Sequence, residues 1–160
     1  MSGRLPAKCG GQQSSLRAGP RIRTRRIAAS NSASGRELCD DPPMRLTVVI
    51  VDDHPEFRES ASALLETEGF AVIGEAADGD EAIAVVERLR PQVVLLDVQL
   101  PGLDGFAVAE RLAARPDPPR IVLISSREAA AYGPRLEAAA AQGFIPKREL
   151  SGSALAALVG

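Results

Sequence analysis

Apolar and polar positions alternate in blocks along most of the chain after residue 45. Five short runs, rich in Val, Ile and Leu, have the length of strands that are buried on both faces. Longer segments with apolar residues on one side separate these runs. The pattern predicts five strands, at residues 46–51, 70–76, 93–96, 121–124 and 143–146.

The segments between these runs have the spacing of amphipathic helices. Pro55 suits the first position of a helix, and Gly69 suits the position just past its end. The apolar face of this first helix is expected to consist of Phe57, Ala61, Leu64 and Leu65. Further helices are predicted at residues 78–90 and 104–114, in the Ala-rich segment before residue 143, and near 151–159.

The alternation of strands and helices predicts an α/β fold, in which a parallel sheet carries helices on both faces. In such doubly wound sheets, ligands bind beyond the carboxyl ends of the strands, where the strand order reverses. In the flavodoxin-like order 2-1-3-4-5, strands one and three are neighbours at that point. Five βα units are expected, with no helix-turn-helix after the last strand.

Carboxylates follow these two neighbouring strands. Asp52 and Asp53 come directly after the first strand, and Asp97 comes directly after "VVLL" of the third. Like charges at close range raise one another's pKa, so a bound cation would explain the arrangement. Mg²⁺ binds one or two carboxylates together with waters and phosphate oxygens. The third carboxylate is then free to act as a nucleophile toward phosphorus, as in enzymes that form aspartyl phosphate.

Polar residues also follow strands four and five. Ser125 offers a hydroxyl donor to a phosphoryl oxygen, and Lys147 offers an ammonium to phosphate or to the resting carboxylate. Each residue also has an ordinary explanation, because Asp and Ser often cap helices or form turns, and a lone Lys is usually solvated. Their joint occurrence at four strand ends favours a phosphoryl-transfer site. His54, the only histidine, is interpreted as a loop residue before a helix rather than as a phosphodonor or metal ligand.

The stretches "VVIVDDHPEFRESASALLE", "VVLLDVQLPGLDG", "IVLISS" and "GFIPK" resemble the receiver domain of two-component response regulators, the CheY-like family. The resemblance covers about residues 46–159. It implies a single-domain response regulator whose Asp97 accepts a phosphoryl group from a histidine kinase or phosphotransfer protein, in a Mg²⁺-dependent reaction. It also implies a signalling domain that promotes only its own phosphorylation and dephosphorylation, rather than an enzyme with a separate substrate.

The resemblance assigns the metal ligands. Asp53, Asp97 and the backbone carbonyl of Gln99 are expected to bind Mg²⁺ directly, and Asp52 is expected to act largely through water. Pro101 and Gly102 are expected to shape the loop between Asp97 and the third helix.

The resemblance also assigns the parts of a conformational switch. Ser125 is expected to be the switch hydroxyl, Phe144 the switch aromatic and Lys147 the phosphate partner. The signal is expected to pass to a downstream protein through the face formed by helix four, strand five and helix five. A monomer or a phosphorylation-dependent dimer is consistent with this interpretation.

Two features depart from the pattern of the family. Lys147 is followed by Arg148, where many receivers have proline. Gly133 and Pro134 stand where the fourth helix usually runs, and proline inside a helix costs about 3 kcal/mol. The fourth helix is therefore predicted to start near Pro134, after a long loop, and the last helix is expected to be short.

Other functions remain open on the sequence alone. A receiver-like adaptor would bind its partner without phosphorylation. A flavin-binding protein or an Asp-dependent phosphatase could use the same fold, but the loop after strand one lacks a Gly-rich phosphate cradle and the chain has few aromatic residues. A truncated DNA-binding regulator is the remaining alternative, because "DDHPEFRE" and "GEAADGDEA" most resemble receivers that precede a helix-turn-helix domain.

Residues 1–43 differ in composition from the receiver-like part, residues 44–160. They carry eight Lys and Arg against three Asp and Glu, a net charge of +5, whereas residues 44–160 have a net charge of −7. Their Gly, Ser, Gln and Arg content without apolar period predicts a disordered basic extension, which lies upstream of the start if translation begins at Met44. Contact of "RIRTRR" with nucleic acid and a role as a transit peptide are alternatives.

Cysteine content and hydropathy narrow the class further. Cys9 and Cys39 both lie in the basic extension and are too few for a disulfide framework or a zinc site. No apolar stretch approaches the length of a membrane span. The sequence therefore predicts a cytoplasmic protein without membrane contact, whose folded domain does not itself bind nucleic acid.

Overall fold

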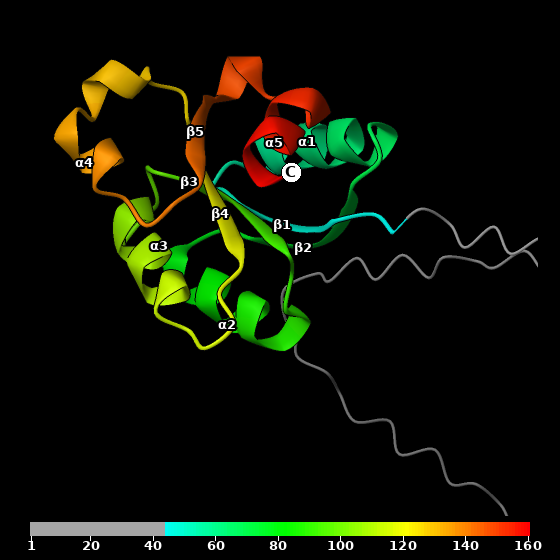
Figure 1. Cartoon of the computed structure of the whole chain (residues 1–160), viewed down its shortest axis with the longest axis horizontal. Helices are drawn as coiled ribbons and strands as arrows, with labels where there is room; N and C mark the ends of the chain where they lie inside the picture. The colour runs from blue at the N-terminus through cyan, green and yellow to red at the C-terminus, as the bar shows by residue number, and fades with distance from the viewer. Residues whose placement is uncertain (1–43) are drawn as a thin grey trace, which may run out of the picture.

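Residues 44–160, which the computed structural model describes, form a five-stranded parallel sheet with helices on both faces (Figure 1). The strand order is β2-β1-β3-β4-β5, so the predicted order 2-1-3-4-5 is confirmed. The strands are β1 Thr47–Val51, β2 Ala71–Ala76, β3 Val93–Asp97, β4 Arg120–Ser125 and β5 Gly143–Pro146. Predictions for residues 1–43 lie outside the described residues.

Five α-helices connect and follow the strands within the described range, as the alternating pattern predicted. They are α1 Pro55–Thr67, α2 Gly79–Leu89, α3 Gly105–Ala113, α4 Pro134–Glu137 and α5 Gly152–Val159. Two 3-10 helices, η1 Ala129–Ala131 and η2 Lys147–Glu149, precede α4 and α5. In Figure 1, α1 and α5 lie together on one side of the sheet, and α2 and α3 lie on the other. No helix among residues 44–160 is long and apolar enough to cross a membrane.

Alternate residues of the central strands face opposite layers of the core. Val49 and Leu96 pack toward α2 and α3, whereas Ile50 and Leu95, one position away, pack toward α1 and α5. The alternation arises because successive side chains of a strand point to opposite faces of the sheet. All four side chains are fully buried, and each such burial stabilises the fold by about 1.5–3 kcal/mol.

The ends of the longer helices follow the expected capping chemistry. Asp78 Oδ1, Asp104 Oδ1 and Ser151 Oγ each accept the backbone N–H of the third residue that follows, at 2.8, 2.9 and 3.1 Å. These bonds satisfy donors that a helix leaves unpaired in its first turn. Gly69 follows α1 with φ of +98°, a backbone conformation that glycine adopts without strain.

The predicted apolar face of α1 is wrong at one position. Ala61 and Leu65 are buried, but Leu64 is 38% exposed. Ala61 and Leu65 are one helical turn apart, and Leu64 lies about 100° around the helix from Leu65. The buried stripe of this helix is therefore narrower than its content of apolar residues indicated.

Side chains fix the alignment of β1 and β3 at their amino ends. Thr47 N–H donates to Gln92 Oε1 at 3.1 Å, and Gln92 N–H donates to Thr47 Oγ1 at 3.0 Å. This reciprocal pair, the Thr47–Gln92 clasp, joins the first residue of β1 to the residue that precedes β3. The two strands then run in parallel with Val51 opposite Leu96.

The segment between β4 and β5 is the least regular part of the described chain. Helix α4 begins at Pro134, as predicted, but ends at Glu137 after four residues. The prediction of an Ala-rich helix is therefore wrong for residues 138–142. Gln142 is bonded to β4, where its N–H donates to Ile121 O at 2.7 Å, so the chain must turn back to the sheet within those residues. The high helix propensity of alanine does not outweigh this requirement.

Candidate functional site

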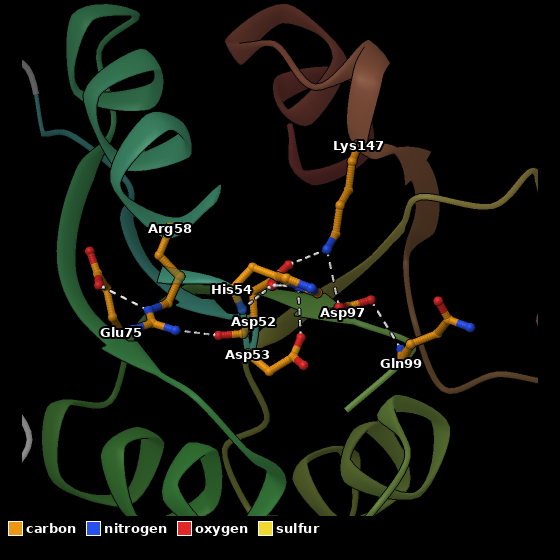
Figure 2. Close-up of polar contacts among 8 residues, drawn as sticks. All are labelled: Asp52, Asp53, His54, Arg58, Glu75, Asp97, Gln99 and Lys147. Atoms are coloured by element: carbon orange, nitrogen blue, oxygen red, sulfur yellow. Dashed lines mark hydrogen bonds and ion pairs between the residues drawn. The ribbon is translucent and has the colours of Figure 1, made fainter. Parts of the chain in front are cut away.

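Three carboxylates meet at the carboxyl ends of β1 and β3 (Figure 2). Asp52 directly follows β1 and is fully buried, and Asp97 is the last residue of β3 and is 2% exposed. The side chain of Asp53 is 37% exposed. One ligand atom from each of Asp52, Asp53, His54 and Asp97 lies within 4.8 Å of the others. We call Asp52, Asp53 and Asp97 the acidic cluster.

Lys147 supplies the opposite charge. It directly follows β5, and its Nζ lies 2.5 Å from Asp52 Oδ2 and 3.1 Å from Asp97 Oδ2 (Figure 2). The ammonium also lies 4.6 Å from the centre of the Phe57 ring on α1. Burial works against the charged form of Lys147, but Asp52 and Asp97 outweigh it and hold the pKa of the ammonium above its usual value. Lys147 therefore carries its charge between the two buried carboxylates.

Asp97 has an environment unlike that of a surface carboxylate. Burial raises its pKa and the nearby charge of Asp52 adds to the rise, while the Gln99 N–H and the Lys147 ammonium lower it. The balance leaves the pKa of Asp97 above its ordinary value. The Gln99 N–H donates to Asp97 Oδ1 at 3.0 Å and Lys147 faces Oδ2, so both carboxylate oxygens are held in place.

The donor set of the acidic cluster fits a hard divalent cation. Asp52 Oδ2 is buried and has no hydrogen-bond donor aligned on it, although Lys147 Nζ is 2.5 Å away. Such an oxygen can accept a further positive partner, and Asp53 beside it is open to solvent on one side. Oxygen ligands of this kind suit Mg²⁺. The predicted role of the Gln99 carbonyl stays a prediction.

His54 takes part in the cluster, which the sequence analysis did not anticipate. Its backbone N–H donates to Asp52 Oδ1 at 2.8 Å. Its ring Nδ1 lies 3.0 Å from Asp52 Oδ1 and 2.9 Å from Asp53 Oδ1. The position before α1 is as predicted. The position of His54 in the sequence, directly after two acidic residues and before Pro55, is the signal that could have indicated its contact with these carboxylates.

Arg58 is a second residue that sequence reasoning missed. It lies one helical turn into α1, and its guanidinium donates to the Asp52 carbonyl oxygen at 2.6 Å and to Glu75 Oε2 on β2 at 3.2 Å. Figure 2 shows this bridge to the left of the acidic cluster. Arg58 thereby ties the start of α1 and the end of β1 to the neighbouring strand.

The predicted switch residues lie together around a third missed residue, Tyr132. Ser125 ends β4 and is fully buried. Its Oγ accepts the Arg127 N–H at 3.1 Å and lies 2.5 Å from Tyr132 Oη. The ring of Phe144, on β5, is half-buried and lies 5.9 Å from the Tyr132 ring, at an angle of 60°. Tyr132 therefore contacts both predicted switch residues, Ser125 through its hydroxyl and Phe144 through its ring.

The loop after β3 packs closely against the start of α3. A Cβ on Gly105 would lie 2.3 Å from the Asp97 carbonyl oxygen and 2.7 Å from Val98 Cα, so a side chain cannot be placed there without movement of backbone. Gly102 has a φ of +78°, which favours glycine. Asp97 is thus positioned by close backbone packing as well as by its hydrogen bonds.

Arg148 forms a contact that a proline at this position could not make. Its guanidinium pairs with Glu128, which lies three residues after Ser125, and with Glu149 at 3.4 Å. These side chains are largely exposed, so the pairs contribute little to stability. They nevertheless connect the segments that follow β4 and β5.

Known proteins resemble this chain across the described fold. The response regulator receiver domain matches residues 48–159. The DNA-binding transcriptional activator EvgA of Escherichia coli strain K12 is 32% identical over 113 residues, which are 71% of this chain and 55% of EvgA. The signal receiver domain of NarL from Mycobacterium tuberculosis is 34% identical, with a TM-score of 0.66, and the match covers 74% of this chain and 99% of that one. A two-component response regulator of the LuxR family from Aurantimonas sp. SI85-9A1 is 29% identical, with a TM-score of 0.64, over 71% of this chain and 85% of its own.

The extent of these matches defines what they establish. The chain spans about half the length of the curated relatives it matches. In this chain, the matched residues 48–159 include the acidic cluster and Lys147. The chain therefore belongs to the response regulator receiver domain family, the signalling domains of two-component systems.

Proposed function

We propose that this protein is a phospho-receiver, in which Asp97 accepts a phosphoryl group from a histidine kinase or a phosphotransfer protein. The observation that carries the proposal is the buried Asp97 carboxylate, held between the Lys147 ammonium and the acidic pair Asp52 and Asp53. Burial and fixed geometry suit a nucleophile that must meet a phosphorus atom in line.

The reaction requires no other nucleophile on the chain. One Asp97 oxygen forms a bond to phosphorus as the phosphorus–nitrogen bond of the donor's phosphohistidine breaks. The donor imidazole leaves with the electron pair of that bond. Lys147, 3.1 Å from Asp97 Oδ2, offsets the charge that gathers on the phosphoryl oxygens. In this role the domain catalyses only its own modification and acts as a signalling protein.

Mg²⁺ is the cofactor that we propose for this site. Asp53 and Asp97 would hold it directly, together with the Gln99 carbonyl, and Asp52 would act largely through water. When bound, it would supply positive charge next to the phosphoryl oxygens. The chain's own contribution is to keep these carboxylates at the ends of two neighbouring strands. Arg58 holds the backbone carbonyl of Asp52, and the Gln99 N–H holds the Asp97 carboxylate.

The output of the phospho-receiver is proposed to be a change in packing. An aspartyl phosphate adds about 1.5 to 2 negative charges, by analogy with other phosphorylated side chains. Ser125, at the end of the next strand, would turn its hydroxyl toward the phosphoryl group, and Phe144 would move inward behind it. The face of α4, β5 and α5 would then favour a different partner complex. We propose that the downstream partner that reads this change in the present chain is a protein.

Intact mass spectrometry tests the proposal directly. The full chain is incubated with Mg²⁺ and acetyl phosphate, beside Asp97→Asn and a matched control, Asp117→Asn, which lies at the opposite end of β4. We expect one added phosphoryl group in the wild type and in Asp117→Asn, and none in Asp97→Asn. Equal uptake by Asp97→Asn would assign the acceptor elsewhere. Absence of uptake by folded wild type, with a small donor and with phosphorylated kinase alike, would favour an adaptor that works without phosphorylation.

A further inference from the structure

Tyr132 occupies a position that connects the Ser125 hydroxyl to the irregular segment after β4. It lies between η1 and α4, and it is the only tyrosine of the chain. Its ring packs edge-on against Phe106 of α3, with 5.8 Å between ring centres, and at a tilt against Phe144 of β5. These ring contacts direct the hydroxyl toward Ser125, where Oη and Oγ are 2.5 Å apart.

The hydrogen-bonding capacity of Ser125 makes this contact consequential. A serine hydroxyl offers one donor and two acceptor positions. The Arg127 N–H uses one acceptor position, and the Tyr132 hydroxyl uses a second position, as donor or as acceptor. A separation of 2.5 Å is at the short end of the range for hydroxyl pairs. A movement of Ser125 Oγ away from Tyr132 would lengthen and weaken this bond.

The segment that carries Tyr132 has little regular structure of its own. Gly133, the next residue, has a φ of +50°, and α4 after it has only four residues. Arg135 supplies another polar attachment, with its guanidinium 2.8 Å from Asp104 Oδ2 and 4.4 Å from the centre of the Phe106 ring. The segment is thus attached to α3 and β4 mainly through side chains, and a short helix contributes little stability of its own.

We infer that Tyr132 is a positioning residue for Ser125: its hydroxyl holds Ser125 and residues 126–138 in the resting arrangement until Asp97 is phosphorylated. The inference rests on the proposed function. When the Ser125 hydroxyl turns to the phosphoryl group, Tyr132 is released. Phe144 lies against the Tyr132 ring, so its inward movement changes the packing of Tyr132. The family resemblance placed the switch on Ser125 and Phe144 and gave Tyr132 no part.

Intrinsic fluorescence provides a direct test, because the chain has one tyrosine and no tryptophan. All tyrosine fluorescence of the chain therefore comes from Tyr132. We expect the emission of the full chain to change when Mg²⁺ and beryllofluoride, a mimic of the phosphoryl group, are added together. In Ser125→Ala, brought to full occupancy by Mg²⁺ and beryllofluoride as measured by fluorine NMR, the change should be lost. An undiminished change in Ser125→Ala would show that Tyr132 does not respond through Ser125 and would overturn the inference.

The rate of phosphoryl uptake provides a second test. Tyr132→Phe keeps the ring and removes only the hydroxyl, which frees Ser125 for the phosphoryl group. We expect uptake from acetyl phosphate to be roughly fivefold faster, the size of effect of one ordinary hydrogen bond. Leu136→Ala loosens the same segment without touching the hydroxyl pair and should leave the rate unchanged, which separates positioning from general loosening.

The outcomes distinguish this inference from the proposed function. Unchanged or slower uptake in Tyr132→Phe would overturn the role of the hydroxyl. Uptake by the wild type without any change in Tyr132 emission would overturn the inference and leave the phospho-receiver intact. Absence of uptake by the wild type from every donor would overturn the phospho-receiver, and the inference with it.

Discussion

The part of the molecule from β1 to β4 and the part from residue 126 to residue 150 are built differently. In the first, α1, α2 and α3 have 13, 11 and 9 residues, and β1, β3 and β4 are almost entirely buried. In the second, η1, α4 and η2 have 3, 4 and 3 residues. We call these the regular part and the irregular part. Both contribute to one site, because the regular part carries Asp52 and Asp97 and the irregular part carries Lys147.

The difference corresponds to two requirements of the proposed chemistry. Buried like charges need fixed positions, since small displacements change their repulsion and their access to a cation. A switch needs groups that can change partners at low cost, and such groups are found where local stability is low. The carboxylates lie on or directly after strands of the regular part, whereas two of the residues expected to respond, Tyr132 and Phe144, lie in the irregular part.

The largest expected effect compares core residues of the two parts. Leu96→Ala removes a fully buried side chain on β3 and should lower the free energy of unfolding by about 3 kcal/mol or more. Leu136→Ala removes a half-buried side chain on α4 and should cost about 1 kcal/mol or less. Urea denaturation of the two variants measures the difference. Similar losses in both would show that the irregular part is as tightly packed as the rest.

Removal of the lysine should have the next largest effect. Lys147→Met leaves Asp52 and Asp97 buried without their cation and should cost about 3 kcal/mol at neutral pH. Because burial raises the pKa of Asp97 in the folded state, the folded protein binds this proton more tightly than the unfolded chain. The loss should therefore shrink as the pH falls through the raised pKa of Asp97 toward the ordinary carboxyl value.

Thermal unfolding across a pH series checks this expectation. Arg148→Met, the adjacent exposed position, is the control and should unfold like the wild type at every pH. Saturating Mg²⁺ should restore part of the stability of Lys147→Met. A loss that stays constant from neutral to acidic pH would argue that the carboxylates do not depend on Lys147.

Two glycines give a smaller and more local comparison. Gly105→Ala places a Cβ against backbone atoms of Asp97 and Val98, which can shift only together with the site, and should cost about 2 kcal/mol. Gly143→Ala meets the side-chain end of Leu158, which can rotate away, and should cost less than about 1 kcal/mol. Differential scanning fluorimetry ranks the two. A reversed order would mean that the loop after β3 is the more adaptable region.

The smallest effect concerns the contact between the two parts. The Ala107 N–H and the Arg135 guanidinium lower the pKa of Asp104. Asp104→Ala removes both contacts and should cost about 1 kcal/mol, whereas Asp104→Asn keeps the cap and should cost less than half of that.

The sign of the pH dependence follows from the lowered pKa of Asp104. The carboxylate stabilises the fold above its ordinary pKa and loses this contribution as the pH falls through the lowered value, below about pH 4. Denaturation of Asp104→Asn and the wild type should therefore converge at acidic pH. A difference that persists there would point to a contact other than the charge.

Sequence patterns predicted the strand ends well, because a parallel sheet turns a position along the chain into a position in space. A polar residue that directly follows a buried run must lie at one edge of the sheet, which is how Asp52, Asp97, Ser125 and Lys147 came to be grouped. The strand order then determined which of these residues are neighbours.

The residues that sequence reasoning missed depend on tertiary placement. The role of Arg58 requires the distance from α1 to β2, and that of Tyr132 requires the path of the irregular part, neither of which has a periodic signature. The prediction of a helix at residues 138–142 was wrong for a related reason, since alanine favours a helix only where the chain is free to form one. The bond of Gln142 to Ile121 removes that freedom.

The Thr47–Gln92 clasp has a consequence at the opposite end of the sheet. Asp52 is five positions after Thr47, and Asp97 is five positions after Gln92, so the two carboxylates reach the same height about 17 Å above the clasp. Asp52 and Asp97 are thus neighbours because β1 and β3 place the same number of residues between the clasp and each carboxylate. Deleting a single residue from either strand would carry one carboxylate about 3.3 Å out of step and turn it to the other face, leaving every residue of the site intact in sequence but not in place.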